Sequence, residues 1–255
     1  MKKSFNYMFF DNQFHKKGFL FLIYTIILVY CSIFSLTGCN NTITLNFLNY
    51  TIITLIVIFG YSIFEGYKIT VIKSINISNE NIQVLPMLNI KKDFIIGIKY
   101  LISFLIFSTP FFCVIGAFGF TVGFATTLNM PSLLIYTSSI LLVLSILAYI
   151  VYLIYFLPAT IAIFAATNSI WSFYKFEEIF KLVFLNKKKY IKSALMYLIL
   201  GIIIEESYRI CLISNSKSLV IFFITTLLSA CIITYIAFIM CHIVAKINNN
   251  HIQVS

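Results

Sequence analysis

Six long apolar stretches, separated by short polar connections, occupy most of this chain. A helix needs about 20 apolar residues to cross the hydrocarbon core of a bilayer, and each stretch has about this length. The pattern therefore predicts an all-α fold, a polytopic integral membrane helix bundle with about six transmembrane helices. The predicted spans cover residues 18–36, 45–64, 94–120, 132–157, 190–213 and 219–244.

The connections between these spans are too short to form a separate soluble domain. The longest, residues 65–93, has 29 residues and is itself half apolar. Hydrophobic residues make up 61% of the chain and charged residues only 10%, which differs strongly from the composition of soluble domains. We therefore expect residues 1–255 to form a single membrane domain.

Two connections share a pattern, in which an amphipathic stretch is followed by a lysine cluster that opens the next span. The clusters are Lys91-Lys92 before the third span and Lys187-Lys188-Lys189 before the fifth. The pattern predicts two interfacial amphipathic segments on the cytoplasmic face. It is compatible with a tandem duplication. It is also compatible with two unrelated connections that each lead the chain back into the membrane in the same way.

In the second of these connections, residues 170–185 are predicted to form one amphipathic helix. Polar residues recur at every third position from Ser172 to Lys181, while Trp171 and several phenylalanines cover much of the remaining surface. Such a helix lies in the membrane interface with its aromatic side chains at the acyl boundary. It would serve either as a packing anchor between two spans or as a sensor of lipid headgroups.

The formal charge of +10 follows the predicted topology. Lysines precede the first span, follow the sixth, and fill the second-to-third and fourth-to-fifth connections, whereas residues 37–44 and 121–131 carry no charge. This alternation matches the positive-inside rule and predicts a cell-membrane protein with both termini in the cytoplasm. Lysines on that face suit the anionic lipids of the inner leaflet. Aromatic stacking surfaces and an arginine-rich face are missing, so nucleic acid is not expected as a partner.

Cysteine and histidine positions predict no metal or cofactor site, because no CxxC pair or Cys/His cluster occurs. Cys39 ends the sequence Leu36-Thr37-Gly38-Cys39, which resembles the end of a bacterial lipoprotein signal. The apolar run before it is long for a signal peptide, so an ordinary first helix is the favoured interpretation. Zinc-binding helices, phosphate-binding glycine loops and serine-hydrolase elbows are also missing, and we expect no enzyme activity.

Pro110 lies in the third predicted span, and Gly116, Gly119 and Gly123 follow it on one helical face. Proline removes a backbone hydrogen bond and kinks a helix, while small residues allow two helices to approach closely. The favoured interpretation is a kinked helix with a tight packing seam. The alternative is a broken helix that forms a transporter site.

Glu205, Glu206 and Arg209 form a charged cluster well inside the fifth predicted span. Ionisable groups within a span are functional candidates, and a spacing of four residues allows Glu205 to pair with Arg209. The rise of about 1.5 Å per residue puts this cluster near the outer surface of the bilayer. A structural ion pair is therefore favoured over a proton- or ion-handling role.

Four short motifs occur in order from the end of the second span into the third: Gly66-Tyr67, Leu85-Pro86, Phe94 with Gly97, and Pro110. Together with the aromatic, lysine-rich run at residues 158–190, they resemble a prokaryotic multi-pass membrane family catalogued as domain of unknown function 4013. The resemblance implies a membrane protein of bacteria or archaea and supplies no activity, substrate or catalytic residue. The family usually has arginines after the first motif, where this chain has Lys68 and Lys73, and this difference argues against a fixed basic site.

These features favour a non-enzymatic membrane component, an accessory, scaffold or immunity-type protein that packs its helices against another membrane protein. The alternative is a small transporter or channel for an ion or small solute, using the Pro110 region and the Glu205/Glu206 pair. A lipid-modifying membrane enzyme is the third and least favoured hypothesis.

Overall fold

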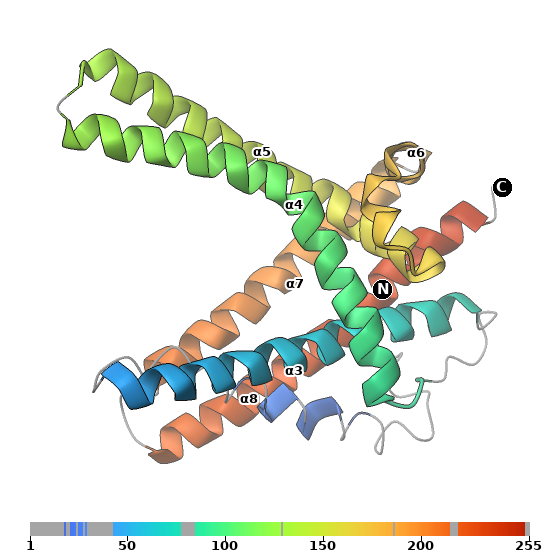
Figure 1. Ribbon diagram of the computed structural model, residues 1–255. Helices are drawn as coiled ribbons and strands as arrows, with labels where there is room; N and C mark the ends of the chain where they lie inside the picture. The colour runs from blue at the N-terminus through green and yellow to red at the C-terminus, as the bar shows by residue number, and fades with distance from the viewer. Residues whose placement is uncertain are drawn as a thin grey trace.

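A computed structural model describes most of the chain, and every regular element in the described part is a helix. The described residues are 18, 21–23, 25–27, 29, 43–77, 85–128, 130–185, 187–214 and 219–252. The helices are α3 (Ile43–Ile77), α4 (Ile90–Thr127), α5 (Ser132–Thr167), η2 (Ile170–Tyr174), α6 (Phe176–Leu185), α7 (Lys187–Ser214) and α8 (Leu219–Ile252). Figure 1 shows their arrangement.

Four of these helices are long and apolar enough to cross a membrane. Their candidate spans are Thr54–Ile75, Ile90–Thr127, Ser132–Thr167 and Val220–Lys246. The predicted span at 190–213 is helical, as part of α7, but lysines at its start and the Glu205/Arg209 cluster interrupt its apolar run. The first predicted span, 18–36, lies mostly outside the described residues, as does Cys39. The membrane character is therefore confirmed, and the count of six spans stays a prediction.

Two of the helices, α3 and α5, extend well beyond the predicted spans. α3 continues past its predicted end at Phe64 to Ile77, and α5 continues past Leu157 to Thr167, through Pro158. Hydropathy alone placed these ends too early because charged residues follow Phe64 and a proline follows Leu157. Packing keeps the extensions helical, since Ile69, Ile72 and most of residues 158–165 are buried.

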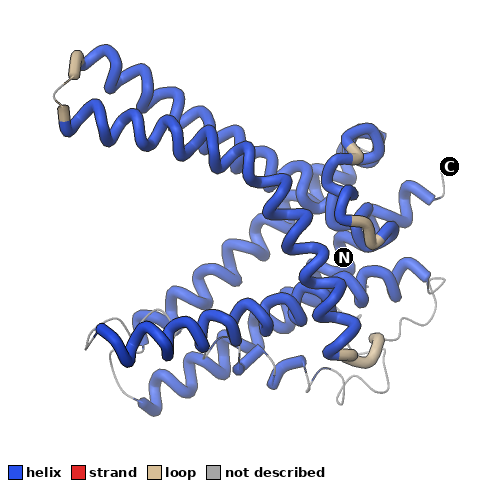
Figure 2. Tube along the Cα trace, in the orientation of Figure 1, coloured by secondary structure: helices blue, strands red, loops and turns tan. Residues whose placement is uncertain are grey.

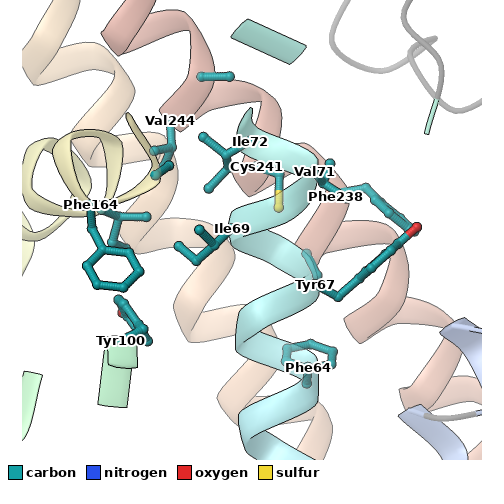
Figure 3. Close-up of a cluster of buried hydrophobic side chains, with 14 of the residues drawn as sticks. Phe64, Tyr67, Ile69, Val71, Ile72, Tyr100, Phe164, Phe238, Cys241 and Val244 are labelled. Carbon is teal, nitrogen blue, oxygen red and sulfur yellow. The ribbon is translucent and has the colours of Figure 1, made fainter. Parts of the chain in front are cut away.

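Most of the large buried side chains gather where α3 ends, α4 begins and α8 approaches its end. Figure 3 shows this cluster, to which α3 contributes Tyr67 and Ile72 and the other helices contribute Phe164 and Phe238, among others. Phe21, from the first predicted span, also belongs to it, with ring centroids 5.1 Å from Phe64 and 5.0 Å from Tyr67. The same end of the molecule carries most of the described lysines.

Away from this core, α4 and α5 form a two-helix hairpin that projects from the other helices (Figures 1 and 2). We call residues 110–127 of α4 and 132–151 of α5 the α4–α5 arm. Within it, Ala125 and Ser138 are buried, whereas the other described side chains are partly or fully exposed. The arm packs mainly against itself.

The surface segment between α5 and α7 differs from the single helix predicted for residues 170–185. It consists of the short 3-10 helix η2 and the separate α-helix α6, with Lys175 between them. Ser172 is the first residue of the predicted polar face, yet it is buried and hydrogen-bonded to Thr167 at 2.7 Å. The predicted face is therefore wrong here, because Ser169 caps η2 and turns Ser172 inward. Trp171 points outward and is 65% exposed.

Candidate functional site at the crossing of α3 and α4

Two helices approach each other very closely where Gly66 of α3 crosses Gly97 of α4. A Cβ atom on Gly66 would lie 1.7 Å from the carbonyl oxygen of Asp93, and one on Gly97 would lie 1.7 Å from that of Ser62. Both distances are far below van der Waals contact, so only glycine permits this backbone approach. The crossing therefore fixes the relative position of α3 and α4.

Asp93 joins the two helices beside this crossing with hydrogen bonds. Its carboxylate accepts one bond from the Thr70 hydroxyl on α3 at 2.8 Å and another from the backbone N–H of Asn89 at 2.8 Å. The Asn89 side chain in turn accepts from the N–H of Lys92 at 3.1 Å and caps the start of α4. Asp93 is fully buried, and these bonds replace the water that its carboxylate loses.

Glu65 and Lys68, which lie on either side of Gly66 in the sequence of α3, form a buried ion pair. The Lys68 ammonium lies 2.9 Å from both carboxylate oxygens of Glu65, and the two side chains are only 16% and 7% exposed. The ammonium also lies 5.3 Å from the centre of the Phe64 ring, within range of a cation–π interaction. Both charges are therefore compensated inside the protein.

Polar groups from three other helices surround this ion pair. Tyr100 of α4, Tyr197 of α7 and Cys241 of α8 are close enough to interact electrostatically with Glu65. The Cys241 thiol also donates to the backbone carbonyl of Lys68 at 3.6 Å. The pair is thus the centre of a polar cluster between α3, α4, α7 and α8. Among the described residues, no three His, Cys, Asp or Glu side chains are placed to hold a metal ion.

The predicted cluster on α7 lies elsewhere and is exposed. The Arg209 guanidinium lies 3.9 Å from Glu205 and 3.5 Å from Glu206, so the predicted pairing geometry occurs. The exposed fractions are 74% for the Glu205 side chain and 60% for that of Arg209. These groups are surface charges, in contrast to Glu65 and Lys68.

The predicted glycine seam after Pro110 does not form within the described part of the chain. A Cβ on Gly116, Gly119 or Gly123 would meet no atom within 4 Å, so this face packs against nothing in the described part of the chain. The tight seam forms at Gly66 and Gly97, where α4 lies across α3, because helix approach depends on which faces meet and not on glycine spacing alone.

One sequence signal could have located the site. Ser62, Gly66 and Thr70 recur at intervals of four, which places small residues on one face of a helix. This stripe is visible only if the second span continues past Phe64. Because the predicted span ended there, Glu65 and Lys68 were assigned to a surface connection.

Comparison with known proteins gives one family. The family described as "Protein of unknown function (DUF4013)" matches residues 49–213, well over half of the chain. The match includes α4, α5, η2 and α6, nearly all of α3 and α7, and therefore the whole crossing of α3 and α4. No curated protein and no solved structure matches the chain.

Proposed function

The chain belongs to the DUF4013 family of proteins of unknown function, and we propose that it is a non-enzymatic membrane component that binds another membrane protein through its α4–α5 arm. The core around the Gly66/Gly97 crossing would hold the arm in place, and the arm would receive a transmembrane helix of the partner. An accessory, scaffold or immunity-type role fits this arrangement, in which the core positions the arm and the arm binds the partner.

The open glycine face of the arm is the observation that carries this proposal. Gly119 and Gly123 have the spacing found in close helix–helix pairs, and both have open space where a Cβ would stand. A helix that faced only lipid would need no such strip of small residues, because contact with acyl chains is satisfied by large apolar side chains.

The polar groups of the arm also suit contact with an apolar helix. Arm hydroxyls donate to carbonyls one turn earlier in their own helices, as Thr121 does to Ala117 at 2.8 Å and Thr137 to Leu133 at 2.9 Å. No charged residue occurs between Lys99 and Lys175. A partner helix could therefore cover this face without leaving a charge unpaired or these hydroxyls unbonded.

Co-purification in mild detergent tests the partner, with Gly119→Leu as the decisive variant. Leucine would fill the open face while favouring the helix by roughly 1 kcal/mol, so the variant should fold. We expect one membrane protein to co-purify with the parent chain and to be lost with Gly119→Leu. Phe223→Leu, at an exposed position of α8, is the matched control and should retain the partner. Retention by Gly119→Leu would contradict the proposal.

For the orientation, we propose that the core end faces the cytoplasm of a prokaryotic cell and contacts anionic lipids. The end of α3, the start of α4, η2, α6 and the start of α7 carry Lys73, Lys91, Lys92, Lys175 and Lys187, among others. In Figure 1 these elements lie toward the same side as the C-terminal end of α8, opposite the turn between α4 and α5. The positive-inside rule supports a cytoplasmic location for the lysine-bearing side.

The buried Glu65–Lys68 pair favours a second candidate, a small transporter for an ion. Ionisable groups within membrane segments often mark ion or proton pathways, and this pair replaces Glu205/Glu206 as the better-placed centre. Proteoliposomes carrying a pH-sensitive dye and a sodium or potassium gradient would test it. Proton flux that is lost in the double variant Glu65→Gln with Lys68→Met, which leaves no buried charge unpaired, and kept in Glu205→Gln would support transport, and absence of flux in the parent protein would contradict it.

A further inference from the structure

Pro110 leaves a backbone carbonyl without its normal partner in the middle of α4. In a regular helix the N–H of residue 110 would donate to the carbonyl of Ile106, but proline has no N–H. An unsatisfied carbonyl within a membrane costs several kcal/mol, so a neighbouring group is expected to satisfy it.

Tyr174 of η2 supplies this group. Its hydroxyl donates to the Ile106 carbonyl at 3.2 Å, although the two residues are 68 positions apart in the chain. The bond therefore links the surface segment to the one carbonyl that Pro110 frees. Loss of this bond would leave the Ile106 carbonyl without a hydrogen-bond donor.

An aromatic cluster surrounds the same point and joins η2 to the base of the arm. The ring of Phe107 lies 6.1 Å from Phe173 and 5.7 Å from Tyr174, both in η2. It also stacks on Tyr152 of α5 at 4.6 Å and lies 5.9 Å from Phe111, the residue after Pro110. Rotation of the arm about Pro110 would change these contacts together.

The two helices of the arm are tied to each other beside the kink. Tyr149 of α5 donates to the hydroxyl of Ser108 at 3.2 Å, and Ser108 is fully buried. α5 is therefore expected to follow α4 when the kink angle changes.

We propose that Pro110 is the hinge of the α4–α5 arm and that η2 is a latch on this hinge, with the Tyr174 hydroxyl as its releasable contact. Trp171 extends from the same short helix with its ring 6.0 Å from that of Tyr174, and it is exposed. Displacement of η2 at the membrane surface would break the Tyr174 bond and free the arm to change its angle. This device goes beyond the proposed partner binding and does not depend on which molecule the arm meets.

Distances between two spin labels test the latch in the full-length protein in lipid nanodiscs. The labels are introduced as spin-labelled amino acids at Leu133, at the end of the arm, and at Val220, at the start of α8, both exposed. The variants are Tyr174→Phe, which keeps the ring and removes the hydroxyl, and Pro110→Ala, which returns an N–H to the Ile106 carbonyl. The two are combined in a double variant.

We expect Tyr174→Phe to shift or broaden the distance distribution in the parent chain and to have no further effect once Pro110→Ala is present. Tyr136→Phe removes an exposed hydroxyl from the arm itself and should leave the distribution unchanged. The latch is refuted if Tyr174→Phe changes nothing, or if its effect is equally large in the Pro110→Ala background. Should Tyr174→Phe fail to fold, recovery of folding in the double variant supports the latch and continued failure refutes it.

Discussion

At the scale of single residues, two charged clusters differ in burial, and the difference is the opposite of what their positions in the sequence suggest. Glu205 and Arg209 stand inside an apolar run and therefore attract attention, but they are mostly exposed. Glu65 and Lys68 stand at the edge of an apolar run and are nearly buried, because α3 continues past them into the core. Hydropathy describes the chain around a residue and contains no information about the helices that will cover it.

We predict that Glu65→Gln destabilises the protein far more than Arg209→Ala. Removal of one partner from a buried ion pair leaves an uncompensated charge and costs about 3–5 kcal/mol. An exposed pair is worth about 0–1 kcal/mol. Unfolding of the variants in one detergent, followed by melting temperature, compares the two directly.

The double variant Glu65→Gln with Lys68→Met is the control for this comparison, because it removes both charges and leaves none unpaired. It should recover most of the stability lost in Glu65→Gln. Equal melting temperatures for Glu65→Gln and the parent protein would mean that the pair is hydrated. This result would contradict the burial of Glu65 and Lys68.

At the scale of the helices, the sequence predicts where apolar segments lie but not how they meet. Gly66 and Gly97 are 31 positions apart, and no sequence pattern links them, whereas Gly116, Gly119 and Gly123 form an obvious stripe. The structure packs the first pair tightly and leaves the stripe open. The missing N–H at Pro110 was predictable because proline acts locally, but the Tyr174 hydroxyl that bonds the Ile106 carbonyl was not, since it comes from a segment predicted as one regular helix.

We predict opposite effects for one substitution at two glycines of α4. Gly97→Ala would place a methyl group against the Ser62 carbonyl oxygen, where backbone cannot move aside, and overpacking of this kind costs about 1–3 kcal/mol or more. Gly116→Ala enters open space and should stabilise the helix by about 0.5–1 kcal/mol. Melting temperatures should fall for Gly97→Ala and rise or stay unchanged for Gly116→Ala.

Gly66→Ala provides an independent check of the same crossing, because its methyl group would meet the Asp93 carbonyl oxygen from the opposite helix. It should resemble Gly97→Ala in its loss of stability. A melting temperature close to that of the parent for both variants would show that α3 and α4 do not cross at these residues.

At the scale of the whole molecule, the long helices are longer than a bilayer requires. α4 has 38 residues, which gives a length of about 57 Å at 1.5 Å per residue, against about 30 Å for the hydrocarbon core. We expect the lysine-bearing core end, with buried Asp93 and the capped start of α4, to lie at the membrane interface and in the aqueous phase, which would account for this excess.

The last prediction concerns how this molecule is oriented in the membrane. Met87 precedes α4 and Leu128 follows it, and both side chains are exposed. If α4 crosses the bilayer once, the two positions face opposite compartments, and Lys91 and Lys92 assign the Met87 side to the cytoplasm.

Cysteine variants Met87→Cys and Leu128→Cys, made in a chain whose native cysteines are replaced, can be treated in intact cells with a membrane-impermeant maleimide. Leu128→Cys should react at once, and Met87→Cys only after the membrane is permeabilised. Reaction of Met87→Cys in intact cells would reverse the orientation, and reaction of both positions would mean that α4 does not span the membrane.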